Sequence, residues 1–265
     1  MCKIIGIDLG RTKCCVSVME GGRPVLIPDR GGSHMTPSAV AWKRNGKKLI
    51  GEAAKRQAED NLAGTFFAIK ENIETGRSVN IRGESYSPQE LTAMIFQKLK
   101  QDAESYLGSR VDEAVLTIPS YFNEIQRQAI RDAGRIAGLK INRFITGPSA
   151  AALSYYLKKK KDQKLLVCDM GSSGFDVSVI EIGDGVVEIL SSGGDKRLGG
   201  NALDEMLVYR MLSDFREKEG VDLAADSTAL YRLREEAEQA KKILTAFCWQ
   251  EAAPGFLPCA GKSSS

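Results

Sequence analysis

Apolar and polar positions alternate in two similar segments that lie far apart in the chain. Residues 3–19 have the sequence KIIGIDLGRTKCCVSVM, and residues 164–182 have the sequence KLLVCDMGSSGFDVSVIEI. In each, an apolar run ends in Asp, one apolar residue and Gly, then a short polar turn leads into a second alternating run, which is typical of a β-hairpin. Asp8 corresponds to Asp169, and Gly10 to Gly171. The repeat predicts two similar lobes that face each other.

Helical patterns separate these two hairpins. Ser87-Pro88-Gln89-Glu90 forms a capping-box signature with proline at the first helical position, which predicts a helix to about residue 107. Asn123, followed by Gln126, predicts the start of another helix that ends before Gly138. We expect three further helices, at about 148–157, from about 201, and at about 227–245.

Apolar runs at residues 111–119 and 141–146 predict strands between the helices. Strands that alternate with helices indicate an α/β fold. After residue 246 the periodicity is lost, and two prolines and a serine tail predict a poorly ordered end. Gly261-Lys262-Ser263 matches the end of a phosphate-binding P-loop, but Phe256 stands at the required upstream glycine, so we exclude that motif.

Composition narrows the function classes. The 265 residues are 43% hydrophobic and carry a net charge of +3 with no long basic stretch, so we expect one or two domains and no nucleic-acid partner. No signal peptide or run of ~20 apolar residues is present, so we expect a cytoplasmic protein without a membrane segment. A single histidine and six cysteines without framework spacing argue against a zinc site or a disulfide set.

The two glycine turns suggest phosphate chemistry. Backbone amides in such turns point outward at an anion, and an Asp just before the turn can hold a hydrated Mg²⁺. Gly199-Gly200, before a predicted helix N-terminus, adds a third anion-binding element. One such hairpin alone is an ordinary turn, but three elements in this order favour a site that grips the phosphates of a nucleotide.

Several segments resemble the DnaK-type heat-shock chaperone family. They occur in family order over residues 1 to about 246, and the run from Glu113 to Leu139 is highly specific. The segments are IIGIDLG, AAKRQAE, FAIK, EAVLTIPSYFNEIQRQA, DAGRIAGL, PSAAALSY, GFDVSVIEI, GGDKRLGG and AEQAKKIL. The resemblance implies an actin-like ATPase fold with ribonuclease H-like duplicated lobes, the second of them incomplete. Lobe I would span 1–160 with a small subdomain at about 38–87, partial lobe II 161–246, and a disordered or non-family tail 247–265.

The resemblance also implies ligands and partners. These are ATP or ADP with Mg²⁺, a J-domain co-chaperone and a nucleotide-exchange factor, whereas the family's peptide-binding domain is absent from this chain. Asp8, Lys70 and Asp169 match catalytic positions, and Asp8 and Asp169 would hold the metal through water. The other positions that match nucleotide-binding residues are Gly10, Arg11, Thr12, Lys13, Gly171, Ser172, Ser173, Asp176, Gly199, Gly200, Glu238 and Lys241. The positions that match interdomain coupling or J-domain docking are Pro119, Arg127, Tyr121, Asn123 and Arg143.

Several positions depart from the family pattern, and four of them bear on the chemistry. Arg11 and Lys13 replace Thr and Asn beside Thr12, Gly147 replaces a glutamate that positions metal and water, and Gly174 replaces a threonine. Arg11 and Lys13 could add charge near the phosphates, fill the phosphate site, or pair with Asp8 or Asp169. Whether the chain is still an enzyme is open on these grounds.

Three functional hypotheses follow. The first is a truncated or divergent chaperone ATPase domain that binds ATP or ADP with Mg²⁺ and hydrolyses ATP weakly. The second is a catalytically inactive pseudo-ATPase, a binding module that interacts with co-chaperones. The third is a sugar kinase or actin relative on the same fold, against which the run from Glu113 to Leu139 argues.

Overall fold

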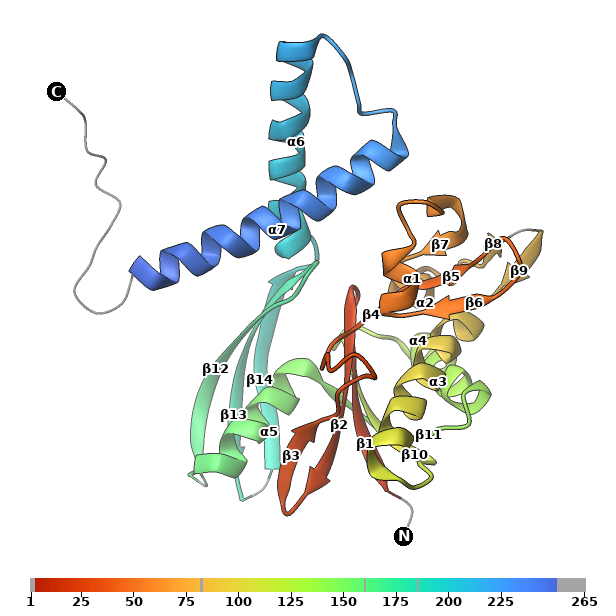
Figure 1. Cartoon of the computed structure of the whole chain (residues 1–265). Coiled ribbons are helices and arrows are strands. Elements are labelled where there is room, and N and C mark those ends of the chain that lie inside the picture. Colours follow the sequence, from red (N-terminus) through yellow and green to blue (C-terminus); the bar gives the residue numbers. More distant parts are fainter. Residues whose placement is uncertain (1–2, 82, 160, 185, 252–265) are drawn as a thin grey trace, which may run out of the picture. The chain divides into compact units, whose positions relative to one another are not determined.

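The computed structural model describes residues 3–81, 83–159, 161–184 and 186–251. The chain forms two compact units, Met1–Lys196 and Arg197–Ser265, whose helices and strands are labelled in Figure 1. The first unit runs across residue 160, where the sequence placed the border between two lobes. The lobe division therefore stays a prediction, whereas the mixed α/β class is confirmed by the elements themselves.

The first unit contains fourteen strands and five α-helices among its described residues. The strands are β1 (Ile4–Leu9), β2 (Lys13–Glu20), β3 (Arg23–Leu26), β4 (Thr36–Pro37), β5 (Val40–Trp42), β6 (Lys48–Ile50), β7 (Thr65–Phe66), β8 (Val79–Ile81), β9 (Glu84–Tyr86), β10 (Glu113–Ile118), β11 (Lys140–Thr146), β12 (Gln163–Met170), β13 (Phe175–Gly183) and β14 (Val186–Asp195). The helices are α1 (Glu52–Arg56), α2 (Ile69–Thr75), α3 (Pro88–Leu107), α4 (Glu124–Ile136) and α5 (Gly147–Lys159), with a 3₁₀ turn at Leu62–Gly64.

The larger sheet has the strand order β11-β10-β1-β2-β3, with β4 paired to β2. β1 is parallel to β10 and antiparallel to β2, so it lies in the middle of the sheet. Its alternate residues Ile5, Ile7 and Leu9 are almost completely buried in the main core, as the period-2 pattern predicts. The same alternation directs Asp8, between Ile7 and Leu9, to the other face, near the end of the strand.

Helices α3 and α4 begin where the capping signals predicted. The Ser87 and Glu90 side chains form the reciprocal capping box of α3, and Asn123 and Gln126 form that of α4. α3 buries a continuous apolar stripe that includes Leu91, Ile95, Phe96 and Leu99, and it packs against α4. The larger sheet, which carries Asp8, is covered by these two helices on its core-facing side.

The smaller sheet repeats the first hairpin in register. Asp8 lies opposite Cys15 in the β1–β2 pair, and Asp169 lies opposite Asp176 in the β12–β13 pair. The spacing is seven residues in both, and a third antiparallel strand follows each hairpin, β3 in one case and β14 in the other. The two predicted hairpins are therefore confirmed, while a duplication of whole lobes stays a prediction.

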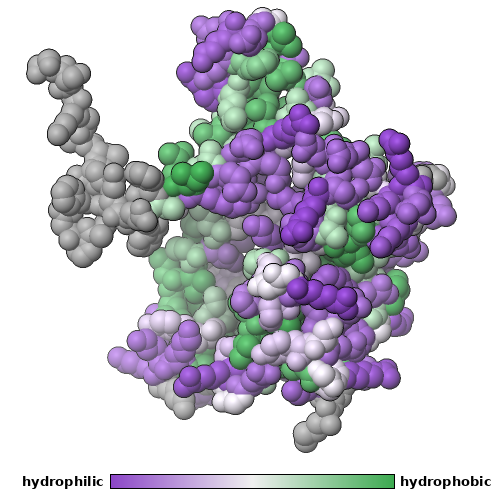
Figure 2. Space-filling model, in the orientation of Figure 1, coloured by the Kyte–Doolittle hydropathy of each residue, from purple (hydrophilic) through white to green (hydrophobic). Residues whose placement is uncertain are grey.

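Helix α5 connects the two sheets, because it contacts β10 and β11 as well as β12, β13 and β14. It covers one face of the smaller sheet, where Ser178, Ile180 and Ile182 of β13 are buried. Leu166 and Met170 on β12 are exposed, and Figure 2 shows apolar surface in the region that β12 occupies in Figure 1. Within the described part of the chain, only one face of sheet β12-β13-β14 is therefore covered.

Residues 40–86 form a small appendage to the larger sheet. Strands β6-β5-β7 make a three-stranded sheet with α1 beside it, and β8 and β9 form a hairpin. Trp42 packs on the rings of Phe66 and Tyr86, which holds the two parts together. This is the stretch for which the sequence suggested a small subdomain.

The second unit consists of α6 (Gly200–Glu219) and α7 (Ser227–Glu251), which pack on each other. The predicted end of the last helix near residue 245 is wrong, because α7 continues through Glu251. The disordered or non-family tail expected over 247–265 stays a prediction. Residues 252–265, with the rejected P-loop match, lie outside the described residues. None of the described helices has the length and apolar character required to cross a bilayer.

Candidate functional site

A pocket of about 340 Å³ lies in the first unit, between the two hairpin turns. Helix α2, the β10–α4 connection and the start of α5 complete its wall. Of the residues proposed from sequence, the structure brings together here Asp8, Gly10, Arg11, Thr12, Lys13, Lys70, Pro119, Tyr121, Asp169, Gly171, Ser172, Ser173 and Asp176. Gly147 and Lys196 also line it.

The turn between β1 and β2 is held in place by hydrogen bonds of buried side chains. Cys14 is buried with its Sγ 3.0 Å from Ser38 Oγ, and Ser38 Oγ donates a 2.9 Å hydrogen bond to the Gly10 carbonyl. A Cβ at position 10 would lie 2.1 Å from the Lys13 carbonyl oxygen, so only glycine fits. Burial raises the pKa of Cys14 to about 12, so this thiol stays protonated and serves the packing of the turn.

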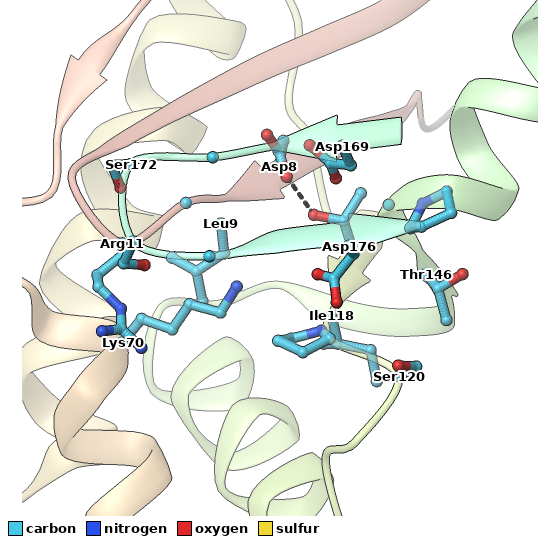
Figure 3. Close-up of a pocket in the computed structure, with 18 of the residues that line it drawn as sticks. Asp8, Leu9, Arg11, Lys70, Ile118, Ser120, Thr146, Asp169, Ser172 and Asp176 are labelled. Atoms are coloured by element: carbon cyan, nitrogen blue, oxygen red, sulfur yellow. Dashed lines mark hydrogen bonds between the residues drawn. The ribbon is translucent and has the colours of Figure 1, made fainter. Parts of the chain in front are cut away.

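The second turn places two carboxylates across from each other. Gly171 N–H donates to the Gly174 carbonyl at 2.8 Å, which closes the turn between Asp169 and Asp176. Figure 3 shows Asp8 and Asp169 near each other at the ends of their strands, with Asp176 on the same side. Burial, and then the charges of Asp176 and Asp8, raise the pKa of Asp169, while Lys70 opposes the shift.

Lys70 extends from α2 into the pocket (Figure 3). Burial lowers the pKa of its ammonium group, and the carboxylates of Asp8 and Glu74 act in the opposite direction. Its Nζ lies 5.9 Å from the centre of the Phe122 ring. Lys70 is therefore a partly desolvated cation that faces the carboxylates of the site, the arrangement that suits a contact with a bound anion.

Arg11 has partners that the sequence did not suggest. Its Nη1 is 3.0 Å from Glu71 Oε1, and its Nη2 donates to Glu74 Oε2 at 3.4 Å. Of the possibilities left open for Arg11, an ion pair with Asp8 or Asp169 is not the one formed, because the guanidinium binds Glu71 and Glu74 of α2. Lys13 lines the pocket beside it.

The proposed coupling residues divide into two groups. Pro119 and Tyr121 line the pocket, and the Tyr121 hydroxyl donates to Glu74 Oε1 at 3.2 Å. Asn123 caps α4, Arg127 Nε donates to the Phe122 carbonyl at 3.0 Å, and Arg143 is exposed on β11. Their role in partner binding stays a prediction.

The remaining proposed residues belong to the second unit. Gly199 is the N-cap of α6, and the Lys241 ammonium donates to the Gly200 carbonyl at 3.0 Å and to Asp204 at 2.7 Å. Glu238 forms an ion pair with Lys242 at 2.9 Å. Within this unit Lys241 connects α7 to the first turn of α6, so it has a structural task in addition to the predicted nucleotide contact.

We expect Lys241→Met to lower the free energy of unfolding by about 2 kcal/mol, because it leaves the buried Asp204 carboxylate without its cation. Lys242→Met is the matched control, since it removes an ion pair whose lysine is exposed on the same helix and should cost less than about 1 kcal/mol. Urea unfolding followed by circular dichroism measures both. Equal effects of the two substitutions would contradict the assignment.

Three pocket residues were missed by the sequence analysis. Thr117 donates a hydrogen bond from its hydroxyl to Asp8 (dashed in Figure 3), Glu74 binds both Arg11 and Tyr121, and the Lys196 ammonium lies 3.7 Å from the centre of the Tyr121 ring. Thr117 could have been found from the parallel pairing of β1 and β10, which places it opposite Asp8. Nothing in the sequence signals the other two, because their partners come from distant segments.

The donor set of the pocket fits a hydrated divalent cation. Asp8, Asp169 and Asp176 supply hard oxygen ligands, and burial, followed by the charges of Asp176 and Asp8, raises the pKa of Asp169, a penalty on its charged form that a cation would reduce. In the described part of the chain, no three His, Cys, Asp or Glu side chains gather closely enough to hold a metal ion directly. A cation that keeps its waters, as Mg²⁺ does, is the one that suits these residues.

A comparison with protein families agrees with this geometry. The model of the family described as Hsp70 protein matches residues 4–78 and 71–253, which is nearly the whole chain. The matched range includes every element that lines the pocket. The chain therefore belongs to the Hsp70 family, whose members are chaperones of the ATPase type.

Proposed function

We propose that the pocket binds ATP or ADP together with Mg²⁺, and that this chain hydrolyses ATP slowly. The observation that carries the proposal is the convergence of both glycine turns, Asp8, Asp169 and Lys70 on one cavity. Membership of the Hsp70 family supports the same ligand.

The phosphates would lie between the two turns. Backbone N–H groups of residues 10–13 and 171–174 offer neutral donors, and the hydroxyls of Thr12, Ser172 and Ser173 add others. Lys70 supplies a positive charge that is partly removed from water, which strengthens its attraction for a phosphate oxygen. The pocket thus offers both hydrogen bonds and charge to a polyphosphate.

Magnesium would be held through water by Asp8 and Asp169, with Asp176 close by. When bound, the ion would neutralise phosphate charge and polarise the phosphoryl group. The residues of the chain have separate tasks. Thr117 fixes the orientation of the Asp8 carboxylate, and Lys70 holds the phosphate on the opposite side.

Slow hydrolysis follows from two missing side chains. Gly147 and Gly174 stand where the family pattern has glutamate and threonine, so no carboxylate or hydroxyl extends from these positions into the pocket. Each single catalytic contact of this kind contributes about 10²-fold or more to a rate. Binding and turnover are therefore expected to be separable in this protein.

The test is calorimetry and thermal unfolding with ATP and ADP, each with and without Mg²⁺. We expect measurable heat and a rise in Tm with either nucleotide when Mg²⁺ is present, and a release of phosphate that is slow on the scale of minutes. Absence of both heat and a Tm shift at millimolar nucleotide would refute the proposal.

Asp169→Asn provides a sharper version of this test. The folded-state pKa of Asp169 is raised, so its charged form is penalised in the folded protein, and stability falls as pH rises from about 3.9 through the folded-state pKa. At pH 7 the neutral amide should therefore raise the Tm of the ligand-free protein. The same variant should lose the additional Tm rise that Mg²⁺ gives in the presence of ATP. A lower Tm without ligand would contradict the assigned electrostatics.

A second candidate is a binding module that interacts with co-chaperones without catalysis. It is favoured by the exposure of Tyr121, Asn123 and Arg143, which match the family positions that dock a J-domain. We expect a J-domain to bind this surface, and Arg143→Ala to weaken that binding at least about tenfold if the arginine is a central contact. Binding that does not change with nucleotide would favour this candidate, and no binding at all would exclude it.

A further inference from the structure

One guanidinium group joins the first hairpin turn to helix α2. Arg11 Nη1 contacts Glu71 Oε1 at 3.0 Å, and Nη2 contacts Glu74 Oε2 at 3.4 Å. Glu71 and Glu74 are three residues apart, so they lie on the same side of the helix. The side chains of Arg11 and Glu74 are 22% and 20% exposed, which makes this a partly desolvated contact.

We propose that Arg11 is a positioning residue, which fixes α2 against the first hairpin turn and thereby places Lys70 in the pocket. Lys70 is the second residue of α2, and Glu71 and Glu74 follow it directly on the same helix. A displacement of α2 would therefore move the Lys70 ammonium group. The expected effect of Arg11 on nucleotide binding rests on the proposed function, whereas the positioning of Lys70 does not.

Glu74 contacts residues from several segments of the chain. Besides Arg11, it accepts a 3.2 Å hydrogen bond from the Tyr121 hydroxyl, and its backbone carbonyl accepts a 3.0 Å bond from Gln126 Nε2. Burial and the Glu74 charge raise the pKa of Tyr121 to about 12, so the phenol remains a donor at neutral pH. The Lys196 ammonium then packs on the Tyr121 ring. α2 is thus connected directly to the β10–α4 segment and to the first hairpin, and through Tyr121 to Lys196, which follows β14.

Helix α2 needs such support because it is weak by itself. It has only seven residues, and a helix of this length has little stability in water. It starts after Ala68, whose φ of 52° and ψ of 42° are left-handed, and no side chain caps it. A left-handed non-glycine residue costs on the order of 1–3 kcal/mol and persists where surrounding contacts hold it. The two ion pairs of Arg11 are contacts of this kind.

The geometry also separates Arg11 from the phosphate donors. Its two terminal nitrogens face carboxylates of α2, so its charge is largely compensated before any ligand arrives. Lys70, by contrast, faces Asp8 and the cavity. Arg11 therefore acts on a bound anion through the position of Lys70.

The experiment measures the pH profile of Lys70 acylation by an amine-reactive reagent, quantified by peptide mass spectrometry, and it needs no nucleotide. Burial depresses the pKa of Lys70, so the midpoint of its profile should lie below the ordinary value of about 10.4. If α2 is released, the ammonium becomes hydrated and the midpoint shifts upward towards that value.

The double substitution Glu71→Gln with Glu74→Gln separates positioning from direct charge effects. The Glu74 carboxylate raises the pKa of Lys70, so the loss of its charge alone would lower the midpoint of the Lys70 acylation profile. Release of α2 predicts the opposite, a rise. Arg11→Lys gives a second test, because it keeps the charge but cannot reach both carboxylates at once. It should also raise the midpoint, by less than Arg11→Met does.

Glu52→Gln is the control, since it removes an exposed ion pair with Arg56 on α1 and should leave the midpoint unchanged. A lowered midpoint in the double variant, or an unchanged one in Arg11→Lys and Arg11→Met, would overturn the proposal. With nucleotide, Arg11→Met should weaken ATP binding, with Arg11→Lys intermediate. If no variant binds nucleotide but the profiles shift as expected, the positioning role stands and the proposed ligand fails.

Discussion

Replacing Gly147 by glutamate together with Gly174 by threonine is expected to raise the kcat for ATP hydrolysis by about 10²-fold or more. The two substitutions restore the carboxylate and the hydroxyl of the family pattern, and each contact of this kind contributes about that much to a rate. Phosphoryl transfer depends mainly on positioning and electrostatics, so two correctly placed groups suffice for a large effect.

The backbone accepts these side chains to different degrees. A Cβ at position 174 would meet the Asp195 carbonyl oxygen at 3.5 Å and Lys196 Cα at 3.6 Å, which are ordinary contacts. A Cβ at position 147 would lie 3.1 Å from Asp169 Oδ2, so this carboxylate must move by a few tenths of an ångström. We therefore expect Gly174→Thr to fold normally by itself, and Gly147→Glu to depend on Mg²⁺.

Gly147→Gln with Gly174→Val is the matched control, because it restores the volume but neither the charge nor the hydroxyl. Steady-state phosphate release with saturating ATP and Mg²⁺ measures the effect. If the control pair accelerates turnover as much as the restored pair, or if neither does while ATP still binds, the two glycines are not the cause of slow hydrolysis.

Phe96→Ala is expected to lower the free energy of unfolding of the first unit by about 3–5 kcal/mol. Phe96 is fully buried on α3, within the cluster that also contains Leu91, Ile95 and Leu116. Removing its ring costs both the transfer of the apolar atoms from water and the cavity that remains. Because this core supports the sheet that carries Asp8, the same variant should lose nucleotide binding at a lower temperature.

Gln101→Ala serves as the control on the same helix, since it is exposed and both residues favour helices, so its effect should stay below about 0.5 kcal/mol. Urea denaturation of both variants gives the comparison. A loss below about 1 kcal/mol for Phe96→Ala would mean that α3 is not packed as described.

Local chemistry explains which elements could be predicted. The start of the helix over Pro88–Leu107 was predicted because its capping box and proline act within one turn. The two hairpins were predicted because alternation and turn residues are also local. For the same reason Asp8, Asp169 and their glycines could be assigned to one type of site before their positions were known.

Contacts between distant segments could not be predicted in this way. Helix α2 was missed because it is short and starts at a left-handed alanine, which no sequence pattern signals. The partners of Arg11 are 60 or more positions away in the chain, and only the folded arrangement brings them together. The extension of α7 to Glu251 was also missed, because the sequence periodicity used to place its end is lost after residue 246.

The shared register of the two hairpins has a consequence for how a ligand enters. At equivalent positions the first hairpin carries Cys15 and the second carries Asp176, while the turn of the first contains Arg11 and Lys13 and that of the second contains Ser172 and Ser173. Duplication alone would give a pocket with two similar walls. The divergence makes the two walls different instead: the first turn places Lys13 beside the pocket while Arg11 binds helix α2, and the second hairpin adds the acid Asp176. A metal–polyphosphate complex has the same asymmetry, so the two walls would align it in a single direction before any close contact forms.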